Sequence, residues 1–228
     1  MSVQIRVANP EDARAIGRIA ADSGVASIDA GARRVRRILA QSQAFVATID
    51  AAVTGFVGCL FTAHPAGGRR VELDLLAVAP EAQRRGVGGR LLAASIAYAR
   101  GEGARQMRAL VRCENAAMQR LCRRHGFACS PEAFELHVVD PQPVAPGSRV
   151  HEARVIAVQT LSYAGLWLEG ELNREAIADA HHLASQIEAT VIGAVIPSKA
   201  LETGKLLQAS GFQIIGAYHW WTINLKSD

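Results

Sequence analysis

The sequence predicts an α/β (α+β) protein with a central mixed, mostly antiparallel sheet flanked by helices, followed by a second, smaller β-α-β-α-β-β unit. Three observations point to this class. Apolar runs of strand length alternate with helical segments along all 228 residues. Hydrophobic residues make up 50% of the chain, which is enough for one large core or two small ones. Finally, a proline-rich segment over residues 140–147 separates two stretches whose elements follow a similar order.

The first stretch begins with strong local signals. Residues 3–7 alternate as a strand does, and Asn9-Pro10 with two following acids marks the start of a helix. Residues 50–52 separate two strands of a hairpin. The expected strands of this stretch are 3–7, 44–49, 53–62, 71–78, 105–112, 127–129 and 134–139. The expected helices are 10–22, 32–41, 88–100 and 115–125.

The second stretch repeats part of the first. Its expected elements are strands at 155–160 and 166–168, a helix at 173–187, a strand at 191–196, a helix at 199–210 and strands at 212–217 and 219–225. Leu206 to Phe212 matches Leu121 to Phe127 in its spacing of leucine, glycine and phenylalanine. We therefore predict domains at 1–140 and 151–228, with a linker at 141–150.

The turn from Gln83 to Gly89 is the most specific local feature. It follows an apolar strand, contains three glycines and opens directly into a helix. Glycines there let successive N–H groups face one point, and the positive end of the helix dipole is directed at the same point. Such a turn is suited to phosphate oxygens. The corresponding turn of the second stretch, Glu169 to Glu175, is acidic and nearly free of glycine, so we expect one phosphate site.

Charge is unevenly distributed along the chain. Residues 1–145 hold nineteen arginines, no lysine and thirteen acids, for a net charge of +6, whereas residues 146–228 carry −2. Arginine without lysine, alongside abundant alanine, is typical of biased genomic composition, so charge gives little support for nucleic-acid binding. The four cysteines lack metal-ligand spacing and are expected to be reduced thiols, so no metal is predicted. With no signal segment or membrane-spanning run visible, the expected compartment is the cytoplasm.

Three motifs in sequence give a family resemblance. Gln83-x-x-Gly86-x-Gly88 fits the Q/R-x-x-G-x-G/A signature of the GNAT superfamily of acyl-CoA-dependent N-acyltransferases. The preceding Leu76-Ala77-Val78-Ala79-Pro80 fits its L-x-V-x-P strand end. Downstream, Asn115-Ala116-Ala117 through Leu121 to Gly126-Phe127 fits its N-x-x-A…L-x-x-x-G-F segment. Residues 3–139, about 60% of the chain, resemble this family, and the second domain looks like a degenerate copy.

The resemblance implies acetyl-CoA as co-substrate. The turn would hold its pyrophosphate, the preceding strand would pair with its pantetheine arm, and the N–H of Val78 would polarise the thioester carbonyl. Asn115 would reach the pantetheine or the acceptor. The residues implied to bind acetyl-CoA are Leu76, Ala77, Val78, Arg84, Arg85, Gly86, Val87, Gly88, Gly89 and Asn115.

Two residues are candidates for proton transfer. Glu72 stands eleven residues before Gln83, a spacing that resembles the catalytic glutamate of histone-type members; the alternative is a structural pairing of Glu72 with an arginine. Asp74 should share the face of Glu72 on the strand. Cys122 stands seven residues after Asn115, where many members have a tyrosine general acid, and its alternative role is buried packing.

We therefore predict an N-acetyltransferase that transfers an acetyl group from acetyl-CoA directly to a primary amine of a small molecule or protein side chain. The alternative is a non-catalytic acyl-CoA-binding sensor or scaffold, and a third reading is an acyltransferase for nucleic acid. The second domain is expected to form the acceptor side of the cleft or to provide a homodimer surface. The sequence does not identify the acceptor.

Overall fold

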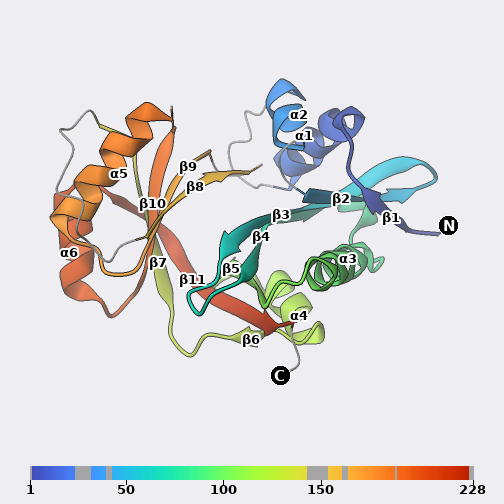
Figure 1. The fold of residues 1–228 in the computed structure, drawn as a ribbon. Helices are drawn as coiled ribbons and strands as arrows, with labels where there is room; N and C mark the ends of the chain where they lie inside the picture. The colour runs from blue at the N-terminus through green and yellow to red at the C-terminus, as the bar shows by residue number, and fades with distance from the viewer. Residues whose placement is uncertain are drawn as a thin grey trace.

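The computed structural model describes residues 2–23, 32–39, 43–142, 154–160, 164–187 and 189–225. Within them one eleven-stranded sheet runs through the molecule in the order β1-β2-β3-β4-β5-β11-β7-β10-β9-β8, with β6 paired to β11 (Figure 1). The strands are β1 (Gln4–Val7), β2 (Gln43–Ile49), β3 (Ala52–Ala63), β4 (Arg69–Val78), β5 (Gln106–Arg112), β6 (Ala128–Cys129), β7 (Phe134–Val139), β8 (Arg154–Gln159), β9 (Ala164–Glu169), β10 (Val191–Pro197) and β11 (Gln213–Asn224). The helices are α1 (Ala13–Asp22), α2 (Ala32–Leu39), α3 (Val87–Gly101), α4 (Ala116–Arg124), α5 (Arg174–Gln186) and α6 (Leu201–Ala209).

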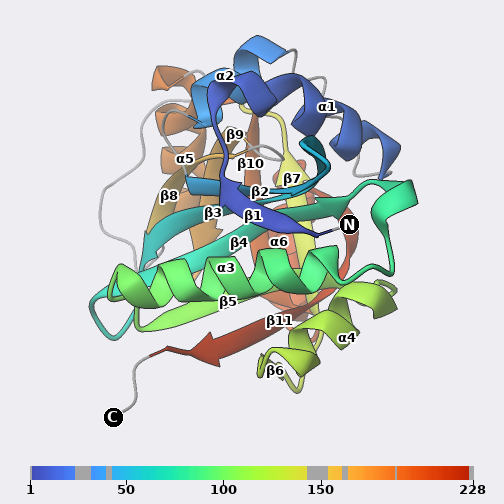
Figure 2. The same cartoon turned by 90° about the vertical axis from the view of Figure 1, so that its right-hand side faces the viewer.

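Helices cover both faces of the first half of the sheet. Helices α1 and α2 lie on one face, and α3 and α4 lie on the opposite one (Figures 1 and 2). α1 presents Ile16 and Ile19 to the core, and α3 presents Leu91, Leu92 and Ile96, each spaced to share one side of its helix. Burial of these side chains, at about 1.5–3 kcal/mol each, fixes both helices on the sheet.

The second half repeats the strand–helix–strand arrangement of the first. β4 and β5 are parallel and joined by α3, and β9 and β10 are parallel and joined by α5. A separate core lies here, built from residues such as Leu166, Ile192 and Leu207. α5 and α6 lie on the outer side of this half (Figure 1).

The last strand joins the two halves. β11 pairs with β7 through Gln213–Tyr218 and then with β5 through Tyr218–Asn224. β7, which comes from the first half of the chain, pairs in turn with β10 of the second half. Trp221 of β11 is buried in the first core. The sheet is therefore continuous, and each half of the chain contributes a strand to the other.

The observed elements differ from the sequence prediction in two places. The strands expected at 212–217 and 219–225 are one strand, because an irregularity between Ile214 and Gly216 is absorbed as a bulge and no turn forms. The N-terminal helix starts with a 3₁₀ turn at Pro10–Asp12, capped by the Asn9 side chain. Most of the expected linker, residues 143–150, lies outside the described residues. None of the described helices is long and apolar enough to cross a membrane.

Candidate active site

β4 and β5 lie side by side for only part of their length. Their described pairing joins Arg70–Leu73 of β4 to Gln106–Ala109 of β5 and stops there. Beyond that point Leu76–Val78 remains paired with β3, and Leu110–Arg112 remains paired with β11. The two strands therefore diverge beyond this point. The gap between Leu76–Val78 of β4 and Leu110–Arg112 of β5 is called the wedge below, and the backbones of these two segments form its edges.

The edge of β4 presents amide groups to this wedge. Ala79 donates its N–H to Thr54 O on the β3 side at 2.9 Å. Residues in an antiparallel pair alternate between facing the partner strand and facing away from it. The amides of Val78 and Leu76 therefore point away from β3, into the wedge. An extended chain with amide groups could pair there as an additional strand.

The turn after β4 has the backbone conformation that an anion site requires. Arg84 and Gly86 are both left-handed, with φ of +59° and +77°. Helix α3 begins at Val87 with Gly86 as its N-cap, and the described structure gives this cap no side-chain hydrogen bond. By contrast, the Asn173 side chain caps α5 by accepting a hydrogen bond from Ala176 N at 2.8 Å. The first N–H groups of α3 are thus available for a phosphate.

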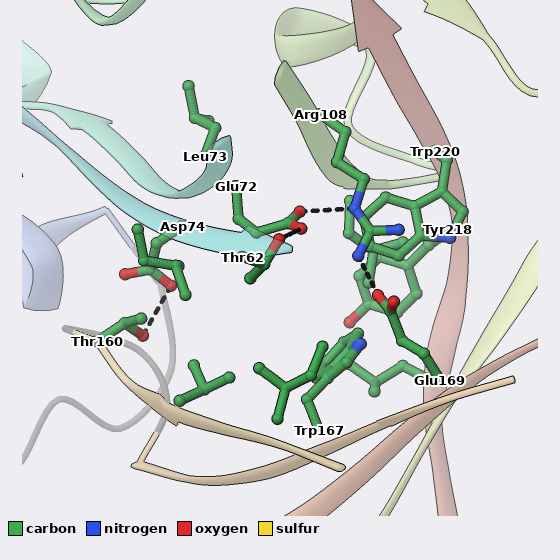
Figure 3. Close-up of a pocket in the computed structure, with 15 residues that line it drawn as sticks. Thr62, Glu72, Leu73, Asp74, Arg108, Thr160, Trp167, Glu169, Tyr218 and Trp220 are labelled. Atoms are coloured by element: carbon green, nitrogen blue, oxygen red, sulfur yellow. Dashed lines mark hydrogen bonds and ion pairs between the residues drawn. The ribbon is translucent and has the colours of Figure 1, made fainter. Parts of the chain in front are cut away.

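A pocket opens beside this wedge (Figure 3). It encloses about 210 Å³ and lies between β3, β4 and β5 of the first half and β8 and β9 of the second. Its lining residues are Leu60, Thr62, Glu72, Leu73, Asp74, Arg108, Leu110, Leu136, Ile156, Val158, Thr160, Trp167, Glu169, Tyr218 and Trp220. Both halves of the chain therefore build one cavity.

An ion cluster forms one wall of the pocket. Glu72 Oε1 accepts hydrogen bonds from Arg70 Nε at 2.6 Å and Thr62 Oγ1 at 2.7 Å, and Glu72 Oε2 accepts one from Arg108 Nε at 2.6 Å. Glu169, on β9, accepts from Arg70 Nη2 at 3.0 Å and from Arg108 Nη2. Each arginine therefore contacts both carboxylates. The cluster, defined as Arg70, Glu72, Arg108 and Glu169, joins the two halves and is electrically neutral.

The cluster is shielded from water. Arg70 is 3% exposed and Arg108 13%, and the Arg108 guanidinium lies 3.8 Å from the centre of the Trp220 ring. Burial would raise the pKa of Glu169, but the charges and hydrogen bonds of Arg108 and Arg70 outweigh it and hold that pKa below its ordinary value. Glu169 is thus held ionised.

Asp74 lies in a different part of the pocket from the ion cluster (Figure 3). It is one residue beyond the last β4–β5 pair, at a register irregularity between β3 and β4. Its Oδ1 accepts a hydrogen bond from Thr160 Oγ1, just after β8, at 2.9 Å. A carboxylate therefore lies in the pocket at the point where the wedge begins.

The residues predicted to bind acetyl-CoA gather around the wedge. Those from Leu76 to Val78 form the edge of β4, and those from Arg84 to Gly89 form the turn and the start of α3. Asn115 is the N-cap of α4, where its side chain accepts a hydrogen bond from Met118 N at 3.0 Å. Their roles stay predictions, with geometry suited to them.

The two predicted catalytic residues lie in unlike places. Glu72 lines the pocket and is paired with arginines, as its structural alternative expects. Cys122 is fully buried in the first core and is absent from the pocket lining. Burial raises the pKa of its thiol to about 12. This environment favours the packing role of Cys122 over that of a proton donor.

Sequence reasoning missed most of the pocket. Arg70, Arg108, Trp167 and Glu169 were not singled out as site residues, although all four lie in or beside it. The available signal was weak: Arg70 and Arg108 are charged residues within otherwise apolar strands, where a buried charge needs a partner.

Comparisons with known proteins concern the family and the fold. The model of the acetyltransferase (GNAT) family matches residues 17–127. No curated protein matches the sequence significantly. Among solved structures, the fold is similar to that of a protein from Pyrococcus horikoshii assigned as an acetyltransferase, at 13% identity and a TM-score of 0.62, over 98% of this chain and 90% of that one.

Two further structures extend the likeness. A GCN5-related N-acetyltransferase from Sphaerobacter thermophilus has 13% identity and a TM-score of 0.61, over 99% of this chain and 96% of that one. A protein from Salmonella typhimurium, assigned as an acetyltransferase and solved with its cofactor acetyl-CoA, has 24% identity and a TM-score of 0.51 over 58% of this chain and 83% of its own. At these identities the likeness concerns the fold, and the first two similarities include the second half of the chain.

Proposed function

Because residues 17–127 form a domain of the acetyltransferase (GNAT) family, we propose that this protein transfers an acetyl group from acetyl-CoA to a primary amine. The observation that carries the proposal is the wedge between β4 and β5, with an uncapped helix N-terminus at one side and a carboxylate-bearing pocket at the other. The wedge would supply a strand edge for the pantetheine arm, the helix N-terminus an anion site for the pyrophosphate, and the pocket carboxylate a proton acceptor for the amine.

The wedge and turn suit acetyl-CoA. The pyrophosphate would contact the N–H groups at the start of α3, where Gly86 takes a left-handed conformation and has nothing within 4 Å of an added Cβ. The pantetheine amides would pair with Leu76 and Val78 on the open edge of β4. We assign the Val78 N–H to the thioester oxygen, because that amide points into the wedge.

The acceptor must lose a proton before or during transfer. An ammonium acceptor first gives up one proton, and the nitrogen of the neutral amine then forms a bond to the thioester carbonyl carbon while the C–S bond breaks. A second proton of that nitrogen passes to the sulfur, so that CoA leaves as a thiol. We assign Asp74 to accept the proton of the ammonium group, directly or through water, since Asp74 lies where the wedge opens into the pocket. Both oxygens of Glu72 are already held by hydrogen bonds, so we assign Glu72 to positioning Arg70 and Arg108.

Calorimetric titration with acetyl-CoA tests the anion site. Gly86→Glu places a negative side chain and a strained backbone at the turn, and we expect it to abolish the binding heat. Gly67→Glu is the matched control, because Gly67 is also left-handed, with φ of +82°, and also has open space around it. Binding that survives Gly86→Glu unchanged would remove the turn from the cofactor site.

Turnover tests the proton acceptor. An amine screen that detects the free thiol of released CoA should show activity in the wild type. Asp74→Asn should lower kcat by about 10²–10⁴-fold and remove the acid limb of the pH–rate profile, with acetyl-CoA affinity retained. Glu72→Gln should retain that limb. The reverse pattern would make Glu72 the base, as its sequence position predicts.

The non-catalytic alternative has a distinct outcome. A sensor or scaffold would bind acetyl-CoA with Gly86-dependent heat and release no thiol with any amine of a broad panel. The pairing of Glu72 with two arginines is the observation that favours this alternative. Release of free thiol that the wild type shows and Asp74→Asn loses would exclude the non-catalytic alternative.

A further inference from the structure

We propose that His125 contacts the pyrophosphate of acetyl-CoA and becomes protonated when it does so, which makes cofactor binding take up a proton. This inference rests on the proposed function and adds a titratable residue to its anion site. It follows from the position of the imidazole, from its hydrogen-bonding capacity and from the charges of the elements around it.

The imidazole of His125 lies against the first turn of α3. His125 is the C-cap of α4, and its Nε2 would lie 3.5 Å from a Cβ added at Gly89, the third residue of α3. Cα–Cβ bonds in a helix tilt toward its N-terminus, so this contact places the ring at the end of α3 that has free N–H groups. Figure 2 shows α4 beside this end of α3. The ring therefore neighbours the turn assigned to the pyrophosphate.

The same turn of α3 also borders the wedge. A Cβ added at Gly88 would lie 3.6 Å from Leu76 Cδ2 and 3.8 Å from Val78 Cγ2. Gly88 and Gly89 are neighbours in α3, where successive side chains point about 100° apart. The edge of β4 thus lies on one side of the turn and His125 on the next. A pantetheine arm paired with β4 would bring the pyrophosphate to a site that the imidazole adjoins.

The imidazole has hydrogen-bonding capacity to offer. The rings of His64 and His181 accept hydrogen bonds from Ala66 N and Gln142 N, whereas the described residues provide no such partner for the ring of His125. A neutral imidazole has one N–H donor, and a protonated one has two. A hydrogen bond between two charged groups is roughly twice as strong as one between neutral groups. A phosphate beside this ring therefore favours its protonated form.

Without a phosphate, the surroundings favour the neutral ring. Burial lowers the pKa of His125 below its ordinary value of 6.5. The turn before α3, the start of α3 and the end of α4 carry charge only as arginine, at Arg84, Arg85, Arg90, Arg123 and Arg124. These elements offer no carboxylate to a protonated imidazole. The charged pyrophosphate would raise the pKa of His125, so a proton is taken up between the lower pKa of the free protein and the higher pKa of the complex.

Calorimetric titration with 3′-dephospho-CoA measures this uptake, when it is repeated in buffers of different ionisation enthalpy. The probe keeps the pyrophosphate but lacks the 3′-phosphate, whose own second pKa of about 6 would titrate in the same range. We expect the association constant of the wild type to rise about three- to tenfold from about pH 8 to about pH 5.5, because one unit of pKa shift corresponds to tenfold. The rise should level off below the pKa of the free protein.

Three variants separate charge from shape. His125→Gln keeps a hydrogen-bonding side chain without the titratable charge, so it should bind the probe and lose the rise on acidification. His125→Arg supplies a permanent charge and should bind at about pH 8 as tightly as the wild type does at about pH 5.5. His182→Gln, on α5 in the second half of the chain, is the matched control and should keep the rise of the wild type.

Histidine NMR follows the same protonation without relying on affinity. The His125 ring signal, identified by its loss in either variant at that position, should titrate at higher pH in the complex than in the free protein. An equal pKa in the two states, or a rise in the association constant that His125→Gln retains, would overturn the inference and leave the acetyl-CoA site in place. Wild-type protein that gives no binding heat with acetyl-CoA would instead remove the anion site and the inference together.

Discussion

Glu169→Gln is the sharpest test of how the two halves are held together. Glu169 lies on β9 and accepts hydrogen bonds from Arg70 and Arg108, which lie on β4 and β5. The glutamine keeps the size and one acceptor oxygen but removes the negative charge. Two buried guanidinium groups would then share Glu72 as their remaining carboxylate within the cluster.

The expected cost follows from burial. Arg70 is 3% exposed and Glu169 is 16% exposed, so neither charge recovers much solvation when the partner is lost. Removing one partner of a buried ion pair costs about 3–5 kcal/mol. Because Glu72 still contacts both arginines, we expect the lower end, about 3 kcal/mol in the free energy of unfolding.

Urea unfolding at pH 7, monitored by circular dichroism, measures this change in the free energy of unfolding. The control is Glu202→Gln, which removes the charge from an exposed pair with Lys205 at 2.8 Å on α6. That variant should change stability by less than about 0.5 kcal/mol. A Glu169→Gln protein as stable as the control variant would refute the role of the cluster in holding the halves together.

The pH dependence checks the same reasoning. The pKa of Glu169 in the folded protein is below its ordinary value of 4.5, so its stabilising effect is fully present above that value and is lost as the pH falls through the folded-state pKa. The stability difference between wild type and Glu169→Gln should therefore be constant near neutral pH and shrink on acidification below 4.5. A difference that grew on acidification would contradict the assigned sign.

Two further predictions concern buried positions. Cys122→Ala should lower the free energy of unfolding by about 1–2 kcal/mol and leave kcat intact. Iodoacetamide near neutral pH should label exposed Cys113 before Cys122. A tenfold loss of kcat in Cys122→Ala with normal acetyl-CoA binding would instead support Cys122 as the general acid. Gly165→Ala should destabilise the protein by more than about 3 kcal/mol, because the added Cβ would lie 1.8 Å from Val191 O. Gly204→Ala within α6 should instead stabilise it by up to about 1 kcal/mol. Thermal denaturation measures both changes, and Tm shifts of the same sign in the two variants would contradict this reasoning.

The local parts of the fold followed from the sequence. The glycine-containing turn opens directly into α3 as the sequence predicted, and within it Arg84 and Gly86 are left-handed. The start of the N-terminal helix at Asn9 followed from its capping residues in the same way. β11 was predicted as two strands, since its change of partner from β7 to β5 has no local signal.

The sequence by itself therefore predicted the fold class and the resemblance to the GNAT family, and the comparisons bear out both. The cofactor edge stays a prediction that depends on motifs of a few adjacent residues. Only the tertiary structure decided the partners of Glu72 and the composition of the pocket. Glu72 and Glu169 are far apart in the chain and meet because Arg70 and Arg108 lie between them. The physical reason is that charge neutralisation and pocket shape depend on which strands become neighbours, and β11 and β9 bring the second half of the chain onto the first.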